Sequence, residues 1–260
     1  MAIATIDDLI GKEQRLALAA PERYGVYYFH ARDTALLLSK CLVSVDISQV
    51  YFARFFSYTK KHHLLAILSS VRLHKVQAFM NLRHVLEGGT WAAYAIAHPK
   101  QDAFVETGPD GMIRMSNKLT NRRNVWLDKN FRDASTYIKT QKDRINETIA
   151  HAGLVYTQTV FDINEASRTY ELPFFDNEDG FHIRTDLWLI AAIGISLMDL
   201  FYGVKHQCGG IMEFAADFED HVRALQQQNA ALQHVLQSDE RHTEIEARER
   251  ALKEQACQKA

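Results

Sequence analysis

An arginine and a histidine on one predicted helix face are the residues of this sequence best suited to phosphodiester chemistry. Arg144 and His151 are seven positions apart in the stretch 139–156, KTQKDRINETIAHAGLVY. A helix turns every 3.6 residues, so the two side chains would lie on one face about 10.5 Å apart along the axis. Asn146 and Glu147 fall between them. This set predicts a site that binds or cleaves a phosphodiester, or else a satisfied polar seam inside a helical bundle.

A second group of polar residues interrupts an otherwise apolar segment upstream. Residues 49–98 contain no interior Pro, and Gly occurs there only as Gly88 and Gly89, which predicts two helices or one bent helix with a break near 60–63. Buried polar groups need partners because unpaired burial costs about 1–3 kcal/mol per group. Five residues in this segment are candidates for a binding site: Arg72, His74, Asn81, Arg83 and Glu87. Arg83 and Glu87 are spaced i,i+4 and can bond directly, and the first four of the set could line the pocket of a ligand sensor.

A basic stretch lies between these two groups. From Arg114 to Arg144 the sequence has nine Lys or Arg residues against three Asp, a local charge of +6, whereas the whole chain has a formal net charge of −2. Such a stretch can attract a polyanion such as RNA, with Arg122 and Arg123 as candidate contacts. It can also be an ordinary solvated face of a helix.

Several classes of site are not expected. The sequence has no Walker loop, no G-x-G-x-x-G after a strand, no G-x-S-x-G and no HExxH. His62, His74 and His84 do not have the i,i+4 spacing of a helical metal pair, so neither a metal site nor a cofactor is predicted. Three distant Cys residues and an N-terminus unlike a signal peptide predict a reduced, cytoplasmic protein.

Glycine, proline and capping residues divide the chain into predicted helices. We expect short helices at 6–19 and 21–45, and, after a loop at 102–115, helices at 116–131 and 135–157. The segment 158–184 is least clear, and RTYELPFF within it suits a short strand or strap. The predicted organisation is an all-α, multi-helix bundle in three parts: N-terminal helices in 1–45, a bundle core in 46–207 and a C-terminal helix in 208–260.

The run 187–204, LWLIAAIGISLMDLFYGV, approaches the length of a membrane span. It contains Asp199 and two Gly residues, so a helix buried in the centre of a soluble bundle is the better interpretation. We therefore predict no membrane association.

The C-terminal segment repeats apolar residues with the 4-3 spacing of a short coiled coil. Asn229 occupies what would be an a position, where Asn commonly fixes the register of a dimer. The pattern decays after residue 238. It predicts a homodimer; the alternative is an amphipathic helix packed on its own bundle.

An all-helical chain with Arg, six residues and then His late in a helix resembles HEPN domains, the higher eukaryotes and prokaryotes nucleotide-binding family. The stretch 82–87, LRHVLE, with WAAY at 91–94, also resembles uncharacterised bacterial HEPN-like proteins. The resemblance covers roughly residues 50–204. Active HEPN ribonucleases commonly have a polar residue directly after the Arg, whereas this chain has Ile145 there.

The resemblance implies metal-independent RNA cleavage at a site shared between two subunits. His151 would act as general acid or base, Arg144 would stabilise the charge on the phosphorane, and Asn146 would orient a phosphate oxygen. Two hypotheses follow. The first is a HEPN-like RNA-binding protein or endoribonuclease of a bacterial stress or phage-defence type. The second is a non-enzymatic helical interaction or ligand-sensing module whose Arg, His and Glu residues form a structural polar network.

Overall fold

The computed structural model describes residues 5–108, 110–114, 116–148, 162–164, 169–171, 173–177, 179–244 and 247. They form a mostly helical protein, as predicted from the sequence. Its described α-helices are α1 (Ile6–Tyr24), α2 (Val26–Lys40), α3 (Val50–Val71), α4 (Lys75–Ala97), α5 (Asn117–Asn130), α6 (Arg132–Thr148), α8 (Gly180–Cys208) and α9 (Phe218–Gln237).

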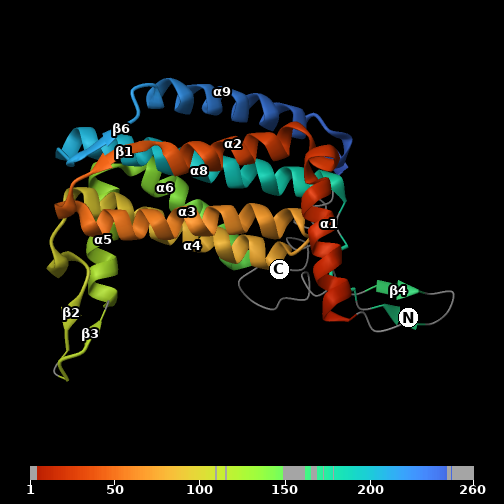
Figure 1. The fold of residues 1–260 in the computed structure, drawn as a ribbon, viewed down its shortest axis with the longest axis horizontal. Helices are drawn as coiled ribbons and strands as arrows, with labels where there is room; N and C mark the ends of the chain where they lie inside the picture. The colour runs from red at the N-terminus through yellow and green to blue at the C-terminus, as the bar shows by residue number, and fades with distance from the viewer. Residues whose placement is uncertain are drawn as a thin grey trace, which may run out of the picture.

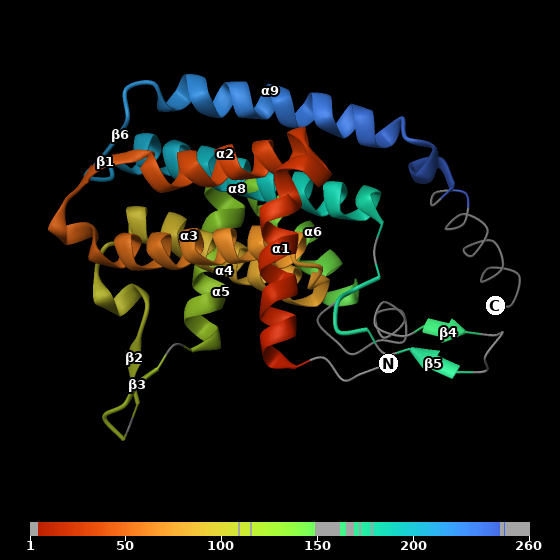
Figure 2. The same ribbon diagram turned by 45° about the vertical axis from the view of Figure 1, so that its right-hand side comes forward.

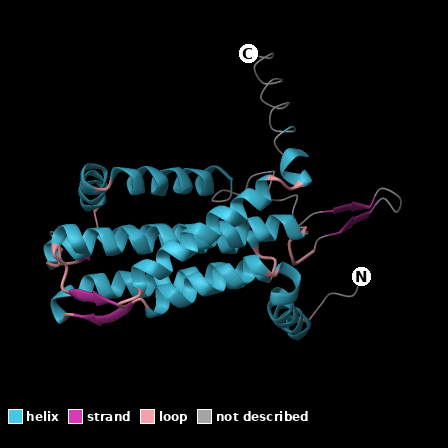
Figure 3. Cartoon of the chain, turned by 90° about the horizontal axis from the view of Figure 1, so that it is seen from above, coloured by secondary structure: helices cyan, strands magenta, loops and turns pink. Residues whose placement is uncertain are grey.

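Short strands and 3-10 turns join these helices. The strand pairs are all antiparallel: β1 (Leu42–Val45) with β6 (Met212–Phe214), β2 (Glu106–Thr107) with β3 (Ile113–Arg114), and β4 (Asp162–Asn164) with β5 (Thr169–Glu171). The 3-10 turns are η1 (Ile47–Gln49) and η2 (Gln101–Ala103). The strand expected in RTYELPFF is therefore present as β5. Figure 3 shows short strand pairs at the periphery of a helical body.

The long helices lie side by side in stacked layers. In Figure 1 and Figure 2, α9 covers α2 and α8, and α3 and α4 lie beneath them, while α1 and α5 cross at steep angles. Helices α3 and α4 form an antiparallel hairpin, and α8 packs against α2, α3, α4 and α9. One apolar cluster includes residues from each of the ranges 1–45, 46–207 and 208–260.

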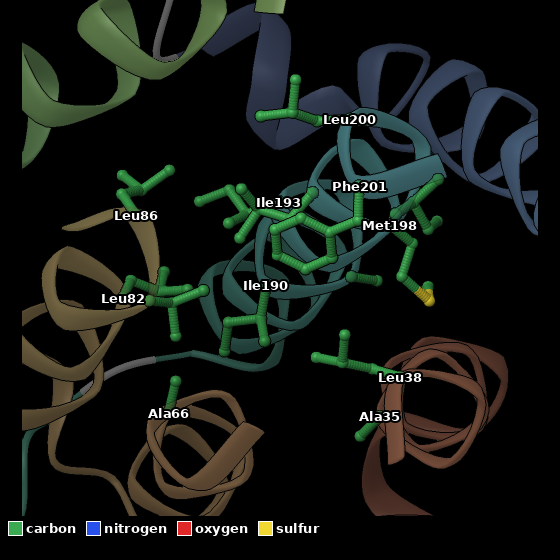
Figure 4. Packing of buried hydrophobic residues seen from close by; sticks show 14 of the residues in the cluster. Ala35, Leu38, Ala66, Leu82, Leu86, Ile190, Ile193, Met198, Leu200 and Phe201 are labelled. Atoms are coloured by element: carbon green, nitrogen blue, oxygen red, sulfur yellow. The ribbon is translucent and has the colours of Figure 1, made fainter. Parts of the chain in front are cut away.

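Helix α8 forms the centre of the core. Its side chains Ile190, Ile193 and Phe201 are fully buried. Figure 4 shows them facing Leu82 on α4 and Leu38 on α2. Within the described residues, α8 alone has the length and apolarity to cross a membrane, and 67% of that window is buried by the rest of the chain. The helix is thus the buried central helix expected from the sequence, and the cytoplasmic location stays a prediction.

Helix α8 approaches α3 and α4 closely at two glycines. A Cβ added at Gly194 of α8 would lie 2.6 Å from Nε2 of His63, and one added at Gly89 of α4 would lie 2.6 Å from Leu197. Nε2 of His63 donates to the carbonyl of Ile190 at 3.0 Å, and burial lowers the pKa of His63 to about 4, so the ring is neutral. These contacts leave no room for a larger side chain at either glycine.

Residues 49–98 form two helices, but the predicted break near 60–63 is wrong. The chain turns at Arg72–His74, where Leu73 has a φ of +61°, a left-handed conformation unusual for leucine. The carbonyl of Leu73 accepts from the backbone N–H of Asp176, 2.9 Å away. The carboxylate of Asp176 in turn accepts from the N–H of Lys75 at the start of α4. A distant segment therefore stabilises this turn.

Other helix starts also differ from the prediction. Helix α6 begins at Arg132 instead of Ser135, and α8 begins at Gly180, where the Asp179 side chain caps it, instead of Thr185. The first predicted helix continues through Pro21, because α1 ends only at Tyr24. The described part of α6 ends at Thr148, so the predicted continuation to 157 lies outside the described residues.

Helix α9 packs on its own chain. Its buried residues Phe218, Val222 and Leu225 belong to the same core as α2 and α8. Asn229 Oδ1 lies 3.0 Å from Nε2 of His30, and its carbonyl accepts from Nε1 of Trp188 at 3.0 Å. This packing accounts for the 4-3 spacing without a second chain, so the homodimer stays a prediction without support from that pattern.

Replacing Gly194 by Ala should destabilise the protein. Overpacking lowers stability by about 1–3 kcal/mol. The better helix propensity of Ala raises stability by only about 1 kcal/mol. The matched control is Gly203→Ala on the same helix, where the nearest atom to the added Cβ is 3.7 Å away. We expect urea unfolding to give a lower free energy for Gly194→Ala and an equal or higher one for Gly203→Ala. Equal stabilisation of both variants would contradict the close packing.

Candidate functional site

The predicted site residues meet first in a charged network around Glu87. Its carboxylate lies 3.1 Å from Nη1 of Arg123 on α5 and 2.7 Å from Nζ of Lys142 on α6. The predicted direct bond between Glu87 and Arg83 is replaced by these two contacts. Glu87 therefore joins three helices, and within this network its role is structural.

Arg123 is the most deeply buried cation of the described chain. Its side chain is 1% exposed, its guanidinium lies 4.5 Å from the ring centre of Trp91, and it donates to Oδ1 of Asn124. Buried charges are tolerated when they are paired and hydrogen-bonded. Arg123 was expected to contact a polyanion, but at this depth it holds α5 against α4 instead.

The network shifts the pKa values of Glu87, Arg123 and Lys142. Burial raises the pKa of Glu87, but Lys142 and Arg123 outweigh it and keep that pKa below its usual value. Burial lowers the pKa of Lys142, Glu87 opposes this, and the nearby Arg123 and Arg83 lower it further. Arg83 is half-buried, and its Nη1 has no hydrogen-bond acceptor among the described residues.

Arg72, His74 and Asn81 are held in two other places. Arg72 Nη1 and His74 Nε2 bind the carboxylate of Glu13 on α1, at 3.2 and 2.8 Å. Asn81 bonds His62 across the α3–α4 hairpin. Arg72 and His74 thus contact α1, whereas Asn81 contacts α3, so these residues are not gathered in the single sensor pocket that the sequence suggested.

The phosphodiester residues are only partly placed. Arg144 is exposed and lines a groove of about 550 Å³ between α6, α8 and α9. Asn146 is half-buried and does not line this groove. It is two residues after Arg144, and residues with this spacing lie on different faces of a helix. Ile145 between them is a core residue, 2% exposed. His151 lies outside the described residues.

A larger cavity lies where α4 ends and α5 passes it. Its volume is about 710 Å³, and its lining combines aromatic and basic side chains. The rings of Tyr94 and His98 stack at 4.1 Å, and Trp126 meets each of them edge-on at 5.4 Å. Lys100, Arg122 and Lys129 supply positive charge and Asp102 one negative charge.

The exposed face of α5 extends this basic character. Lys118, Arg122, Val125 and Lys129 are all exposed and follow each other at i, i+4, i+7 and i+11, so they form one stripe. The three cations of this stripe have no ion pair among the described residues, whereas Arg114 pairs with Asp110, and Lys139 pairs with Asp128. Of the nine basic residues in the predicted region, Lys118, Arg122 and Lys129 therefore form the exposed basic stripe on α5 that is unpaired within the described part of the chain.

The aromatic–basic cavity and the Arg144 groove adjoin through a third hollow. This hollow, of about 390 Å³ at the α5–α6 junction, shares Asn130 with the cavity. It shares four lining residues with the groove: Asp133, Ala134, Ser196 and Asp199. The hollow therefore lies between the cavity with the aromatic rings and the groove with Arg144.

The groove itself is rich in polar groups. Tyr137 bonds Ser196, and burial raises the pKa of the Tyr137 hydroxyl. Burial also raises the pKa of Asp199, whose carboxylate lines the groove. Gln141, Arg144, Gln226, Asn229 and Gln233 add donors and acceptors. Such a lining suits a polar ligand with both hydrogen-bonding and charged groups.

The aromatic residues around the cavity were not predicted as site residues from the sequence. Tyr94 and His98 are spaced i,i+4, and Trp126 adjoins the basic stripe, which is the interleaving of aromatic and basic residues typical of nucleic-acid sites. No cluster of three or more His, Cys, Asp or Glu residues that could hold a metal ion occurs among the described residues.

Comparison of the chain with protein families, curated proteins and solved structures finds no match. The HEPN resemblance therefore stays a prediction.

Replacing Glu87 by Gln should unfold part of the network. Removing one partner of a fully buried ion pair costs about 3–5 kcal/mol. The Glu87 side chain is 34% exposed, so solvent screens part of this interaction, while Arg123 and Lys142 remain largely buried. We therefore expect a smaller loss, about 2 kcal/mol, in urea unfolding at pH 7. Glu219→Gln, which removes an exposed carboxylate paired with Arg223 on α9, should change stability by less than about 0.5 kcal/mol.

Comparison of wild type with Glu87→Gln at different pH values tests the charge of this carboxylate. Because the folded pKa of Glu87 lies below its ordinary value of 4.5, its stabilisation is complete above that value and is lost as pH falls through the folded pKa. The stability difference between wild type and Glu87→Gln should therefore shrink between pH 5 and pH 3. A constant difference would show that the carboxylate charge does not stabilise the fold.

Proposed function

We propose that this protein binds single-stranded RNA, with the aromatic–basic cavity at the end of α4 as the principal contact. The observation that supports this most is the meeting of Trp126, His98 and Tyr94 with Lys100, Arg122 and Lys129 around one cavity. Proteins that bind single strands combine aromatic rings, on which bases stack, with cations that follow the backbone.

The exposure of these groups supports the same function. Trp126 and His98 are half-exposed, so a base can stack on their free surfaces, while Tyr94 beneath them is buried and fixes their positions. Lys118 extends the cationic stripe beyond the cavity by about 6 Å, one helical step of four residues before Arg122. A bound strand would place its bases in the cavity and its phosphates along α5.

We propose further that the chain is a HEPN-like protein and that a bound strand continues toward Arg144. The adjoining hollow provides the path, and Arg144 is exposed at its end, as an accessible catalytic arginine requires. The path is not uniformly basic, because Asp133 and Asp199 also line it. In this proposal Arg144 and His151 act in metal-independent cleavage, and a second copy of the chain completes the site.

The second candidate is a non-enzymatic interaction or ligand-sensing module. The Glu87 network favours it, because these polar residues pair with each other and join α4, α5 and α6. The two candidates differ in what the surface of α5 does: RNA binding requires its exposed cations, whereas a scaffold does not.

Loss of the exposed cations should weaken RNA binding. We expect Arg122→Ala and Lys129→Ala each to lower affinity for a single-stranded RNA oligonucleotide in fluorescence anisotropy. Each should reduce the slope of log K against log salt by about 0.7, the value for one phosphate contact to a single strand. The matched control is Arg223→Ala, which removes an exposed cation of α9 on a different helix. An unchanged salt slope in both α5 variants would rule out phosphate contacts there.

Loss of a stacking ring should weaken binding without changing the salt slope. Trp126→Ala should cost about 1–3 kcal/mol, at least about fivefold in Kd, if a base stacks on the indole. Circular dichroism must show an intact fold, because Trp126 also packs against Phe131. Tight binding by a folded Trp126→Ala protein would contradict stacking in this cavity.

Cleavage is tested separately from binding. We expect wild-type protein to cleave mixed RNA in EDTA, and Arg144→Ala and His151→Ala each to lose cleavage while keeping their RNA affinity. RNA binding without cleavage by the wild type would support an RNA-binding protein and remove the nuclease from the proposal. Absence of both activities would favour the interaction module.

A further inference from the structure

A pair of histidines lies on the α3–α4 hairpin, one on each helix. His62 on α3 and His84 on α4 are 22 positions apart in the sequence, and their ring centres lie 4.7 Å apart. His84 is exposed and His62 is half-buried. The antiparallel hairpin thus brings together two histidines from different helices. The spacing of histidines along either helix alone does not provide such a pair.

Each imidazole is fixed through its Nδ1 atom by a residue of the opposite helix. His62 Nδ1 lies 2.7 Å from Oδ1 of Asn81, and His84 Nδ1 lies 2.8 Å from the hydroxyl of Tyr58. The arrangement is reciprocal, because Asn81 precedes His84 on α4 and Tyr58 precedes His62 on α3. Both bonds leave Nε2 as the nitrogen available to a ligand.

The hydrogen bonds also define the proton positions. Asn81 Nδ2 donates to the carbonyl of Gln77 at 2.8 Å, so its Oδ1 faces His62 as an acceptor. His62 Nδ1 must therefore carry the proton, and Nε2 carries the lone pair. The Tyr58 hydroxyl can accept from His84 Nδ1 in the same way.

We propose that His62 and His84 bind one divalent transition-metal ion, such as Cu²⁺, Ni²⁺ or Zn²⁺, through their Nε2 atoms. Neutral imidazole suits these ions. Metal–nitrogen bonds of about 2.0 Å place two coordinated ring centres roughly 5 Å apart, close to the observed separation. Water completes the coordination shell of the ion.

Asn81 and Tyr58 are the outer shell of this site. A metal-binding histidine almost always donates its other ring N–H to an acceptor that sets its tautomer and orientation, and both rings have such an acceptor here. The site is separate from the aromatic–basic cavity and shares no residue with its lining. The proposal therefore does not depend on RNA binding.

Electron paramagnetic resonance of the full chain with one equivalent of Cu²⁺ tests the site. We expect hyperfine splitting from two nitrogen ligands in wild type, and the loss of this signal in His62→Ala and in His84→Ala. His234→Ala removes an exposed histidine of α9 and is the matched control, which should keep the wild-type spectrum. A wild-type spectrum in the His62→Ala, His84→Ala double variant would overturn the proposal.

Competition for Zn²⁺ with a chelating dye tests the outer shell. Each single histidine variant should bind at least about tenfold more weakly than wild type, and Asn81→Ala about tenfold more weakly with both histidines still present. Asn81→Asp should bind at least as tightly as wild type, because a carboxylate acceptor raises the basicity of His62. Simple disturbance of the helix would weaken Zn²⁺ binding in both Asn81 variants and would not give tighter binding in Asn81→Asp than in Asn81→Ala. Equal Zn²⁺ affinity of the wild-type and double-variant proteins would exclude the site.

Discussion

The burial of α8 is the constraint on which the rest of this structure depends. Its apolar residues extend around most of the helix, so α2, α3, α4 and α9 must each cover one side of it. Close contact is achieved at Gly194 and Gly89, where any side chain would collide with a neighbour. With α4 fixed against α8, Glu87 can hold α5 and α6 through Arg123 and Lys142. The position of the basic stripe on α5 therefore depends on a core to which α5 contributes few side chains.

Local signals in the sequence predicted the helical class and several helix ends. Thr5 and Ser116 cap α1 and α5, which begin within one residue of the predicted starts at 6 and 116, and Gly209 ends α8 in a left-handed conformation. The turn between α3 and α4 was placed about ten residues too early because it contains neither Gly nor Pro. It is formed by Leu73 and stabilised by Asp176, and a contact between residues so far apart leaves no local pattern.

The candidate site was predicted only where single helices carry the signal. The basic stripe follows from the spacing of Lys118, Arg122 and Lys129, but the burial of Arg123 depends on how α5 is rotated against α4. The partners of Glu87 come from other helices, so the i,i+4 rule pointed to Arg83 instead. Likewise, the spacing on α9 is that of any amphipathic helix covering an apolar layer, and it does not distinguish a partner chain from the helix's own bundle.

The connections of the bundle also have a consequence for the order of folding. Helices α3 and α4 are joined by a short turn and can pair as soon as both are made. In contrast, β1 pairs with β6 about 170 residues later in the chain, as the register Leu42 to Phe214 shows. During synthesis, the apolar face of α2 thus waits for α8 and α9 before it is covered. Contacts so distant in sequence slow folding, and apolar surface that is exposed in the meantime is prone to aggregation.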